Sequence, residues 1–349
     1  MTDVVTDEAL DSQGMLAAAA GLPEQVFDAA VRARGLEGLP ERDRIENVVV
    51  LGMGGSGMAG DLLAATAGPF LPVPVIVSKG YELPAFVGET SLVFAVSFSG
   101  NTEETVEAAS TAAVEGARLV VVTRGGELGR LATSWGIPVV GVPEGIAQPR
   151  AGIGALAVPA LVVLEEIGLF VGAQQWIDFA VEQLARRRDQ LLSPASPARA
   201  LAARIGRTLP IFYGGGQLGA TAAQRWKSQV NENAKVPAFW NTQPELCHNE
   251  VAGWGQHGDL TRQVFTAVNL RHEYEHPQVV RRFEVVTTLL EEVVASVEEV
   301  WAEGEGQLAQ LLDLILVGDF TTLHLAIQEG LDPGPVPAID QVKGTVATG

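Results

Sequence analysis

The sequence SLVFAVSFSGNTEETVEAAS, residues 91–110, joins an apolar run to a helical pattern through a loop rich in hydroxyl groups. Residues 92–96 are continuously apolar over the length of a strand, which is typical of a strand buried on both faces of a parallel sheet. Asn101 is a good helix N-cap with Glu104 as a capping partner, and apolar residues then recur at helical spacing. The segment predicts a strand, a loop and a helix.

This hydroxyl loop, residues 97–102, has the chemistry of an anion site. A helix N-terminus presents unpaired amide hydrogens and the positive end of the helix dipole, and both favour an anion. Ser97, Ser99 and Thr102 add short, uncharged donors. A phosphate group fits best, and the alternative is a Ser/Thr-rich turn that only caps a helix.

Length and charge limit the classes of partner. The 349 residues are 47% hydrophobic, which is enough for two domains with separate cores. With 42 acidic residues against 23 Lys and Arg, the net charge is −19. This charge argues against binding to nucleic acid or to an anionic membrane surface, so local amides, hydroxyls and a few cations must hold any anionic ligand.

The sequence favours a cytoplasmic protein. Its single cysteine, Cys247, allows no intramolecular disulfide and fits a reducing compartment. The acidic N-terminus has no pattern of a signal peptide. The apolar-rich stretch 151–173 contains Pro159 and two glutamates, which predicts a buried helix rather than a membrane span.

Strands and helices alternate along the chain, which predicts an α/β fold of doubly wound parallel sheets flanked by helices. The first half has strand-length apolar runs at residues 47–51, 74–77, 92–96, 118–122 and 138–142. After a largely helical stretch, a strand at 209–213 and a glycine turn at 214–216 repeat the start of the first half. The strand at 264–270 lacks a following Ser-x-Ser-Gly-x-Thr, so only the first half keeps a complete phosphate site.

Gly52, Gly54 and Gly57 satisfy the dinucleotide fingerprint G-x-G-x-x-G. The expected acidic residue is missing after the second strand, where Ser78-Lys79 stands instead, a pair that would suit the 2′-phosphate of NADP. Two loops at neighbouring strand ends, with Ser56 joining the hydroxyl groups, suit one phosphomonoester better than a pyrophosphate. A phosphosugar is therefore preferred, and an NADP-dependent oxidoreductase stays an alternative.

The segment NENAKVPAFWNTQPELCHNEVAGW, residues 231–254, mixes the polar groups of Glu232, His248 and Glu250 with tryptophans. Such a mixture indicates a partly enclosed pocket, in which a carboxylate shielded from water has a raised pKa and acts as a general base. A polar surface loop is the alternative.

With GMGGSG and SFSGNTEET upstream, NENAK…PAFW…PEL.HNE…GW resembles the bifunctional phosphoglucose/phosphomannose isomerase family, made of two sugar isomerase (SIS) domains. The resemblance spans residues 45 to 343. It implies an intramolecular oxidoreductase of carbohydrate metabolism that interconverts glucose 6-phosphate, and mannose 6-phosphate, with fructose 6-phosphate through a cis-enediolate. It implies no metal and no cofactor. A non-catalytic phosphosugar sensor is the alternative within the SIS fold.

The resemblance also assigns roles. Glu232 matches the glutamate that moves the proton between C1 and C2, and His248 matches a ring-opening histidine that the partner subunit supplies, which implies a homodimer. Arg150 matches the arginine near the enediolate, and Lys343 the lysine that assists ring opening. The phosphate-binding positions are matched by Gly54, Gly55, Ser56, Ser97, Ser99 and Thr102.

Two departures bear on specificity. Family members often carry a threonine in the loop before the terminal lysine, but residues 334–337 have no hydroxyl group, which leaves the use of both epimers open. Cys247 stands where asparagine is common, and an adjacent Cys-His catalytic pair is disfavoured because neighbouring residues rarely face each other.

His272-Glu-Tyr-Glu-His276 satisfies the zinc-protease signature H-E-x-x-H, which needs both histidines on one helix. Pro277 disfavours helix at His276, so a charged surface loop is predicted. His257 and His324 lack a ligand partner at useful spacing and are interpreted as structural.

The predicted organisation places a helical segment, broken at residues 21–23, at 1–45. The remaining boundaries are 46–165 for the first SIS domain, 166–205 for a helical connection, 206–302 for the second SIS domain, and 303–349 for C-terminal helices and the tail with Lys343.

Overall fold

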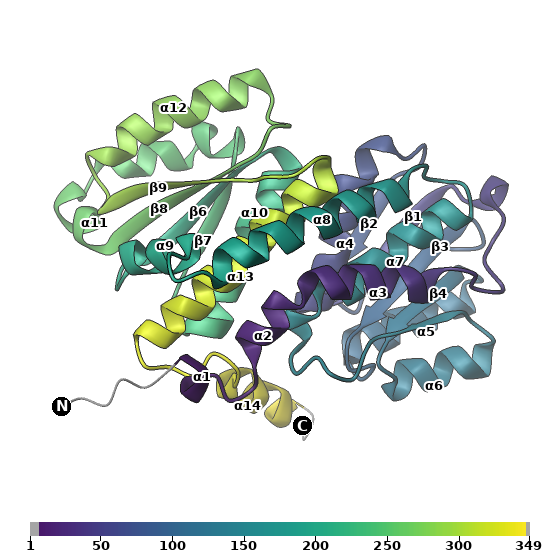
Figure 1. Ribbon diagram of the computed structural model, residues 1–349. Coiled ribbons are helices and arrows are strands. Elements are labelled where there is room, and N and C mark those ends of the chain that lie inside the picture. Colours follow the sequence, from purple (N-terminus) through teal and green to yellow (C-terminus); the bar gives the residue numbers. More distant parts are fainter. Residues whose placement is uncertain (1–6, 347–349) are drawn as a thin grey trace. The chain divides into compact units, whose positions relative to one another are not determined.

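The computed structural model describes residues 7–346, which form two compact units, each with one parallel β-sheet (Figure 1). Of the described residues, the N-terminal unit comprises 21–186 and 303–313, and the C-terminal unit comprises 7–20, 187–302 and 314–346. Two of the four boundaries between them, after Arg186 and after Asp313, fall inside long helices, α8 (Ala173–Leu192) and α13 (Gln307–Gln328).

The sheet of the N-terminal unit has the order β2-β1-β3-β4-β5, and all its neighbours are parallel. Every residue of the two central strands, β1 and β3, is buried, which explains their uninterrupted apolar sequence. The five strands predicted for this half are confirmed to within one or two residues. They are β1 (Asn47–Leu51), β2 (Val75–Ser78), β3 (Ser91–Ser97), β4 (Arg118–Thr123) and β5 (Val139–Gly141).

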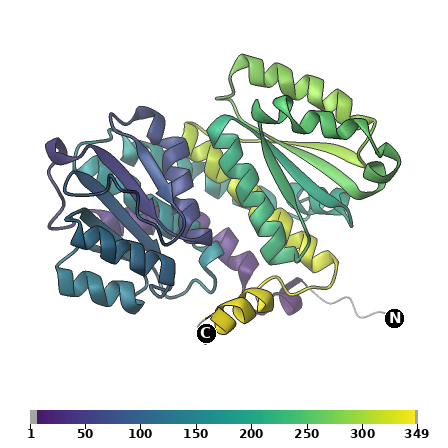
Figure 2. The ribbon, with the colours of Figure 1, turned by 180° about the vertical axis from the view of Figure 1, so that it is seen from behind.

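Helices cover both faces of this sheet (Figure 2). On one face, α5 (Glu103–Val114) and α6 (Gly126–Trp135) pack their apolar residues against Val49, Val93 and Val121. The other face carries α4 (Gly54–Thr66) and α7 (Ile153–Glu166), with α3 (Leu22–Ala33) packed on α7. Since α7 is buried from residue 153 to 164, the predicted buried helix is confirmed.

The C-terminal unit has a four-stranded parallel sheet in the order β7-β6-β8-β9. Its faces are covered by α12 (Pro277–Glu291), which packs on Ile211, Tyr213 and Ala267, and by α10 (Gly216–Gln229) with its buried Trp226. The strands are β6 (Leu209–Gly215), β7 (Phe239–Gln243), β8 (Phe265–Arg271) and β9 (Ser296–Trp301).

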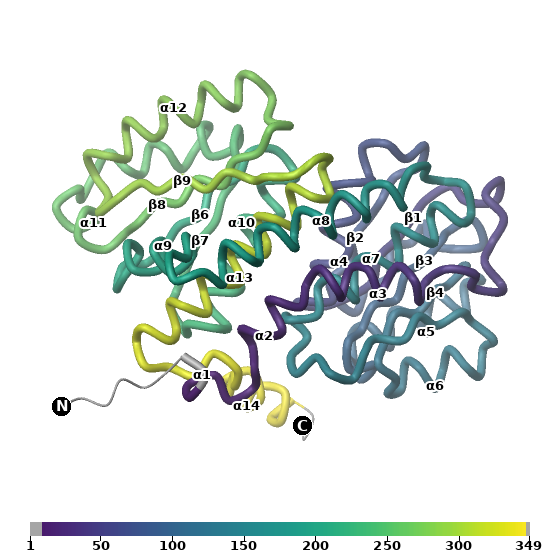
Figure 3. The backbone as a smooth tube through the Cα atoms, viewed as in Figure 1, coloured from purple at the N-terminus to yellow at the C-terminus, as the bar shows by residue number. Residues whose placement is uncertain are grey.

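The two edge strands, β7 and β9, were not predicted from the sequence. Both contain exposed and half-buried residues and many polar side chains, so neither shows an apolar run. The chain has other short helices, of which those designated α are labelled in Figure 3. They are α1 (Asp7–Leu10), α2 (Met15–Ala20), η1 (Arg42–Arg44), η2 (Gly68–Phe70), η3 (Pro149–Ala151), α9 (Pro197–Ile205), η4 (Val230–Ala234), η5 (Glu245–His248), η6 (Glu250–Gly255), α11 (Gly258–Val264) and α14 (Pro337–Val346).

The internal repeat is visible in the backbone of the two glycine turns. A Cβ on Gly57 would lie 2.6 Å from the carbonyl oxygen of Gly52, and one on Gly214 would lie 1.9 Å from that of Gly219. In both halves, the two glycines stand five residues apart and let a strand end touch the helix that follows. The second half therefore also carries G-x-G-x-x-G, from 214 to 219, a match that the sequence analysis overlooked.

One predicted helix cap is wrong. The N-cap of α5 is Thr102 rather than Asn101, and its side chain makes no capping hydrogen bond. The Asn101 carboxamide instead accepts a hydrogen bond from the backbone amide of Glu127, at 2.9 Å, in the first turn of α6. The preference of asparagine for a helix N-terminus is satisfied, but by a helix that tertiary packing brings to it.

Helix α13 is long and apolar enough to cross a membrane, but 94% of its most apolar window is buried within the protein. Buried core helices of this kind share the composition of membrane spans. Its His324 is buried next to Phe320, whereas His257 is exposed and precedes α11 in a left-handed conformation.

Candidate active site

Two loops meet at the carboxyl edge of the N-terminal sheet. The glycine turn after β1 and the hydroxyl loop after β3 follow neighbouring parallel strands, so they leave the sheet on the same side. The Ser56 hydroxyl oxygen accepts a hydrogen bond from the backbone amide of Phe98, at 3.1 Å, and thereby joins the two loops. The structure thus brings the predicted phosphate-binding residues of both loops together.

Hydrogen bonds of its own hydroxyl groups stabilise the hydroxyl loop, residues 97–102. The Ser97 hydroxyl accepts a hydrogen bond from the amide of Gly100 (3.1 Å) and donates one to the hydroxyl of Thr102 (3.0 Å). The Ser99 hydroxyl accepts one from the amide of Asn101 (3.1 Å). Ser97 and Ser56 are buried, Thr102 is half-buried and Ser99 is exposed. The buried pair shapes the loops, and the outer pair presents hydroxyl groups at the surface.

Arg150 lies against the glycine turn. It belongs to the short helix η3, and a Cβ on Gly55 would come within 3.3 Å of its backbone. Its side chain is buried, and Nη1 donates a hydrogen bond to Gln148 at 3.3 Å. Glycine at position 55 therefore allows the backbone of η3 to approach the first turn of α4, a helix N-terminus that favours anions.

A second arginine at this edge was missed by sequence analysis. Arg124 follows β4, the next strand along the sheet, and its guanidinium stacks over the Phe98 ring at 4.2 Å. Its amide also donates a hydrogen bond to the carbonyl of Phe98, at 3.1 Å. The available signal was its place directly after a predicted strand, where functional residues of parallel sheets collect.

The lysine considered for a 2′-phosphate has an intramolecular partner. The Lys79 ammonium forms an ion pair with Asp61 of α4. The Ser78 hydroxyl donates a hydrogen bond to the carbonyl of Glu82 at 3.2 Å. Because Lys79 and Ser78 already have partners within the chain, the end of β2 presents fewer free groups for the 2′-phosphate of NADP than its sequence indicates.

In the C-terminal unit, Glu232 lies in a π-helical turn, η4, that continues α10. Such turns are rare and occur often at functional sites. Asn233 points inward, where its Nδ2 donates to the Thr322 hydroxyl of α13 at 2.9 Å, and Asn231 Nδ2 donates to the carbonyl of Val236 at 2.8 Å. With its two neighbours anchored in this way, Glu232 is held half-buried in a well-defined backbone.

The inward anchoring begins earlier, on α10. Arg225 forms a buried bidentate ion pair with Asp319 of α13, at 2.9–3.1 Å, and Gln229 donates to the same carboxylate at 2.7 Å. Arg225, Gln229 and Asn233 are spaced by four residues, so they share one face of the helix. This buried polar row fixes the end of α10 from which the Glu232 turn projects.

His248 ends the short helix η5 and is exposed. The next segment is tied to the sheet, because the Glu250 carboxylate accepts hydrogen bonds from the Tyr213 hydroxyl and from Asn241 Nδ2, both at 2.5 Å. The Tyr213 hydroxyl in turn accepts one from Trp254 Nε1 at 3.2 Å. Burial, and then the neighbouring Glu250 charge, raise the pKa of Tyr213 far above its usual value, which keeps it a donor. Glu250 therefore anchors the segment that contains His248 to the sheet.

Cys247 and Lys343 complete the predicted set. The Cys247 thiol donates to Gln243 Oε1 at 3.0 Å, in agreement with the rejection of a Cys-His pair. Lys343 is exposed on α14. Glu232, His248 and Lys343 belong to the C-terminal unit, whereas Arg150 and the six phosphate-loop residues belong to the N-terminal unit.

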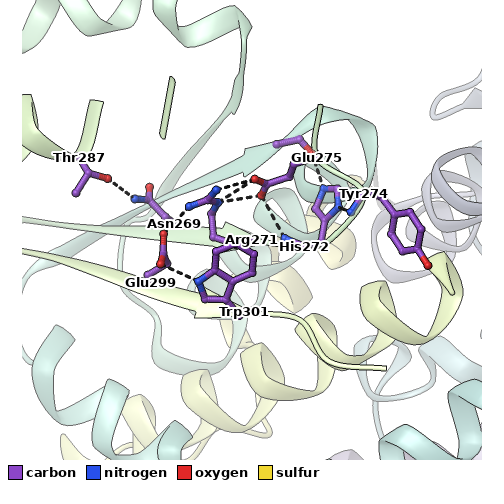
Figure 4. A network of polar contacts seen from close by, with 9 residues as sticks. Asn269, Arg271, His272, Tyr274, Glu275, Thr287, Glu299 and Trp301 are labelled. Atoms are coloured by element: carbon purple, nitrogen blue, oxygen red, sulfur yellow. Dashed lines mark hydrogen bonds and ion pairs between the residues drawn. The ribbon is translucent and has the colours of Figure 1, made fainter. Parts of the chain in front are cut away.

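The H-E-x-x-H sequence is not helical at its second histidine, as predicted, since His276 is the N-cap of α12. The prediction of a surface loop is wrong for His272, which is buried, and for the side chain of Glu275, which is enclosed and contacts Arg271 and the amide of His272 (Figure 4). Glu275 pairs with Arg271, and this charge draws the segment inward. Across residues 7–346, no three His, Cys, Asp or Glu side chains are grouped so that they could hold a metal ion.

Comparison with known proteins identifies both halves. Residues 44–135 match the model of the SIS domain, and residues 195–346 match that of the bacterial phospho-glucose isomerase C-terminal SIS domain. Each half is thus an SIS domain built on a parallel sheet flanked by helices.

Among curated proteins, the chain is 34% identical to a bifunctional phosphoglucose/phosphomannose isomerase of Caldicellulosiruptor bescii, over 93% of this chain and 97% of the relative. It is 33% identical to an enzyme of the same name from Aquifex aeolicus, over 85% and 89% of the two chains. Among solved structures, the C-terminal domain of glucosamine-fructose-6-phosphate aminotransferase from Francisella tularensis superposes with a TM-score of 0.71 at 16% identity, covering 95% of this chain and all of that one. The last likeness concerns the fold alone.

Proposed function

The chain belongs to the bifunctional phosphoglucose/phosphomannose isomerase family, and we infer from this membership that it interconverts glucose 6-phosphate and mannose 6-phosphate with fructose 6-phosphate. It is an isomerase of the intramolecular oxidoreductase class. The observation that carries this conclusion is the 34% identity that extends over 97% of a curated relative.

We propose that the substrate phosphate binds to the two loops of the N-terminal unit, at Gly54, Gly55, Ser56, Ser97, Ser99 and Thr102. The hydrogen bond between the Phe98 amide and the Ser56 hydroxyl supports this proposal, because it holds both loops in one arrangement before a ligand binds. The exposed Ser99 and the half-buried Thr102 are the hydroxyl groups most accessible to a phosphate.

The remaining residues would act on the sugar. His248 and Lys343 transfer protons between the ring oxygen and the C1 hydroxyl, which opens the ring. Glu232 then removes the C2 proton and the same carboxyl group returns it at C1, while the proton of the C2 hydroxyl passes to the C1 oxygen. The anchored π-helical turn supports Glu232 as this base, since a proton-transferring group must be held in place.

The cis-enediolate between these two proton transfers carries developing negative charge on oxygen. We assign its stabilisation to Arg150, whose buried guanidinium is a fixed positive charge. This arginine would take the part of a Lewis acid, so no metal ion enters the proposed reaction.

We also propose a cytoplasmic homodimer in which the partner subunit supplies the histidine at position 248. The exposure of His248 supports this proposal, and so do the exposed aromatic rings of Phe239 (47%) and Trp240 (38%) on β7. Large exposed aromatic side chains are typical of protein interfaces.

The test is proton NMR in D2O with metal-free enzyme, using glucose 6-phosphate and mannose 6-phosphate in separate samples. Wild type should convert both sugars to fructose 6-phosphate, with deuterium entering at the carbon that exchanges its proton. Glu232→Gln should lose at least about 1,000-fold in turnover, because an amide cannot accept the proton. Glu284→Gln makes the same chemical change on the exposed side of α12 and should retain full activity.

Turnover of glucose 6-phosphate alone would restrict the substrate to one epimer and direct attention to residues 334–337, which lack a hydroxyl group. If neither sugar reacts but both bind, the chain is a phosphosugar-binding protein without isomerase activity, and the proposed function is wrong.

A further inference from the structure

Lys235 ends the turn that carries Glu232, and it does so in a left-handed backbone conformation with φ of 56°. Its ammonium donates hydrogen bonds to three carbonyl oxygens, those of Asn233 (2.9 Å), Asp332 (2.7 Å) and Pro333 (3.2 Å). Three carbonyl groups match the three donors of an ammonium. The side chain therefore joins the Glu232 turn to a segment almost 100 residues later in the sequence.

That segment, residues 332–334, is called here the C-terminal turn, and it connects α13 with α14. It is closely held: the Asp332 carboxylate accepts hydrogen bonds from the amide of Gly334 (2.9 Å) and from the hydroxyl of Ser12 (2.5 Å). Pro333 and Gly334 are buried, and a Cβ on Gly334 would lie 2.8 Å from the Gln13 side chain. Helix α14, with Lys343, starts three residues after this turn.

The two segments that Lys235 joins do not depend on it equally. The Glu232 turn has its own anchors, from Asn233 to Thr322 and from Asn231 to Val236. The C-terminal turn takes two of the three hydrogen bonds of the Lys235 ammonium, beside its contact with Ser12. Loss of the ammonium should therefore displace the C-terminal turn, and α14 with it, more than it displaces Glu232.

We propose that Lys235 is a positioning residue, whose ammonium holds the C-terminal turn, and so the start of the helix that carries Lys343, in register with the Glu232 turn. The inference rests on the proposed function, because it takes Lys343 as the residue that assists ring opening. Displacement of a reacting group by about 1 Å can cost about 100-fold in rate. Lys235 thereby governs the ring-opening step without touching the substrate.

The experiment measures kcat and KM for glucose 6-phosphate in Lys235→Met, which keeps the aliphatic stem and removes the ammonium. The variant is made in wild type and in Glu232→Asp, whose shortened carboxylate makes C2 proton transfer the slow step. In wild type, kcat should fall about tenfold. KM should change by less than twofold, because the loops proposed to bind the substrate phosphate belong to the other unit. In the Glu232→Asp background, Lys235→Met should alter kcat by less than twofold, because ring opening no longer limits the rate there.

Three further variants make the outcome decisive. Lys235→Arg keeps a positive charge with several donors and should recover part of the lost kcat. Asp332→Ala loosens the C-terminal turn from its other side and should repeat the pattern of Lys235→Met. Lys227→Met removes an equivalent charge from the half-buried side of α10, away from the three carbonyl groups, and should change neither constant.

An equal loss of kcat in both backgrounds would overturn the inference, because it would indicate a general loss of folded enzyme. So would a loss that appears only in KM. Failure of the proposed function is distinguished from both results, because wild type itself would then show no isomerase turnover.

Discussion

The two SIS domains start from the same turn and use it for different purposes. Both place G-x-G-x-x-G between a central strand and a helix, and in both the first helical glycine, Gly54 or Gly216, has a positive φ. In the first domain, the loop after the neighbouring strand offers hydroxyl groups. In the second, the corresponding loop after β8 turns its side chains inward, onto the glycine turn.

The loop after β8 packs against the glycine turn of the second domain. His272 Nε2 donates a hydrogen bond to the carbonyl of Gly215 at 2.8 Å, and its Nδ1 accepts one from the amide of Tyr274 at 3.2 Å, which defines the tautomer. A Cβ on Gly215 would lie 3.1 Å from the Glu275 side chain. The glycine turn is therefore common to both domains, and the loop beside it differs: one presents hydroxyl groups, as the proposed phosphate site requires, and the other packs within the chain.

Arg271, the last residue of β8, holds this loop through its contacts with Glu275 (Figure 4). Its guanidinium lies between the rings of Phe283 (4.2 Å) and Trp301 (4.6 Å), and it pairs with Glu275 at 2.8 Å and with Glu299 at 2.6 Å. Burial by itself lowers the pKa of Arg271, but the hydrogen bonds and charges of Glu275 and Glu299 more than offset burial and raise the pKa. The arginine is thus charged and fully engaged within the chain.

Arg271→Met should give the largest effect, because it leaves the buried carboxylate of Glu275 without its cation. Removal of one partner of a buried pair costs about 3–5 kcal/mol, so urea unfolding should show a loss of this size in the free energy of unfolding. The control Arg204→Met breaks a pair in which the arginine is 53% exposed, and should cost less than about 1 kcal/mol. A similarly small loss of unfolding free energy in both variants would contradict the structural role of the loop after β8.

In the first domain, the double variant Ser99→Ala/Thr102→Val should act on binding instead. Each hydrogen bond to a charged group contributes about 1.5–3 kcal/mol, so kcat/KM for glucose 6-phosphate should fall about 100-fold or more. The melting temperature should fall by less than in Arg271→Met, because the change removes the acceptor of the Ser97 hydroxyl and that of the Asn101 amide but leaves no charge unpaired. Thr133→Val/Ser134→Ala on the exposed side of α6 is the matched control. A large loss of stability with unchanged kinetics would reverse the assignment of the two loops.

Tyr213→Phe sharpens the comparison, because this tyrosine belongs to the second domain yet supports its proposed catalytic segment. The change deprives Glu250 of a donor and Trp254 of an acceptor, so it should cost about 1–3 kcal/mol in the free energy of unfolding. Turnover should also fall, since His248 lies two residues before Glu250. Tyr274→Phe, at a ring that is 45% exposed, is the control and should be neutral in both assays. Unchanged turnover in Tyr213→Phe would show that the Tyr213–Glu250 hydrogen bond has no part in the reaction.

The smallest expected effect concerns the pH dependence of stability. Burial lowers the pKa of His272 below its ordinary value of 6.5, although the hydrogen bond to Gly215 acts in the opposite direction. Above pH 6.5 both the folded and the unfolded histidine are neutral, so stability is fully present. As the pH falls below 6.5, the unfolded chain binds the proton first, and stability is lost until the folded pKa is reached.

His272→Gln keeps an amide donor toward Gly215 but cannot bind a proton. The melting temperature of wild type should therefore fall more steeply between pH 7.5 and 5.5 than that of this variant. The exposed His257→Gln should leave the slope of wild type unchanged. Parallel curves for all three proteins would show that His272 titrates alike in the folded and unfolded states.

Much of the fold could be predicted because its signals are local. An apolar run of strand length, as in residues 92–96, reports burial on both faces of a sheet, and a glycine after such a run reports a close turn into a helix. The resemblance of residues 231–254 to one family likewise lies in a continuous stretch of sequence. Edge strands such as β7 and β9 carry no such pattern, because half their surface faces water.

By itself, the sequence determined the two α/β halves, the hydroxyl loop and the family. Only the tertiary structure decided the partner of each polar side chain: Asn101 caps α6, Glu250 braces against Tyr213, and Lys235 binds the carbonyl groups of residues 332 and 333. The physical reason is the range of the interactions. Periodicity and turn chemistry act over a few residues, whereas a hydrogen bond needs only proximity in space and links residues as far apart in the sequence as Lys235 and Pro333, which are 98 positions apart.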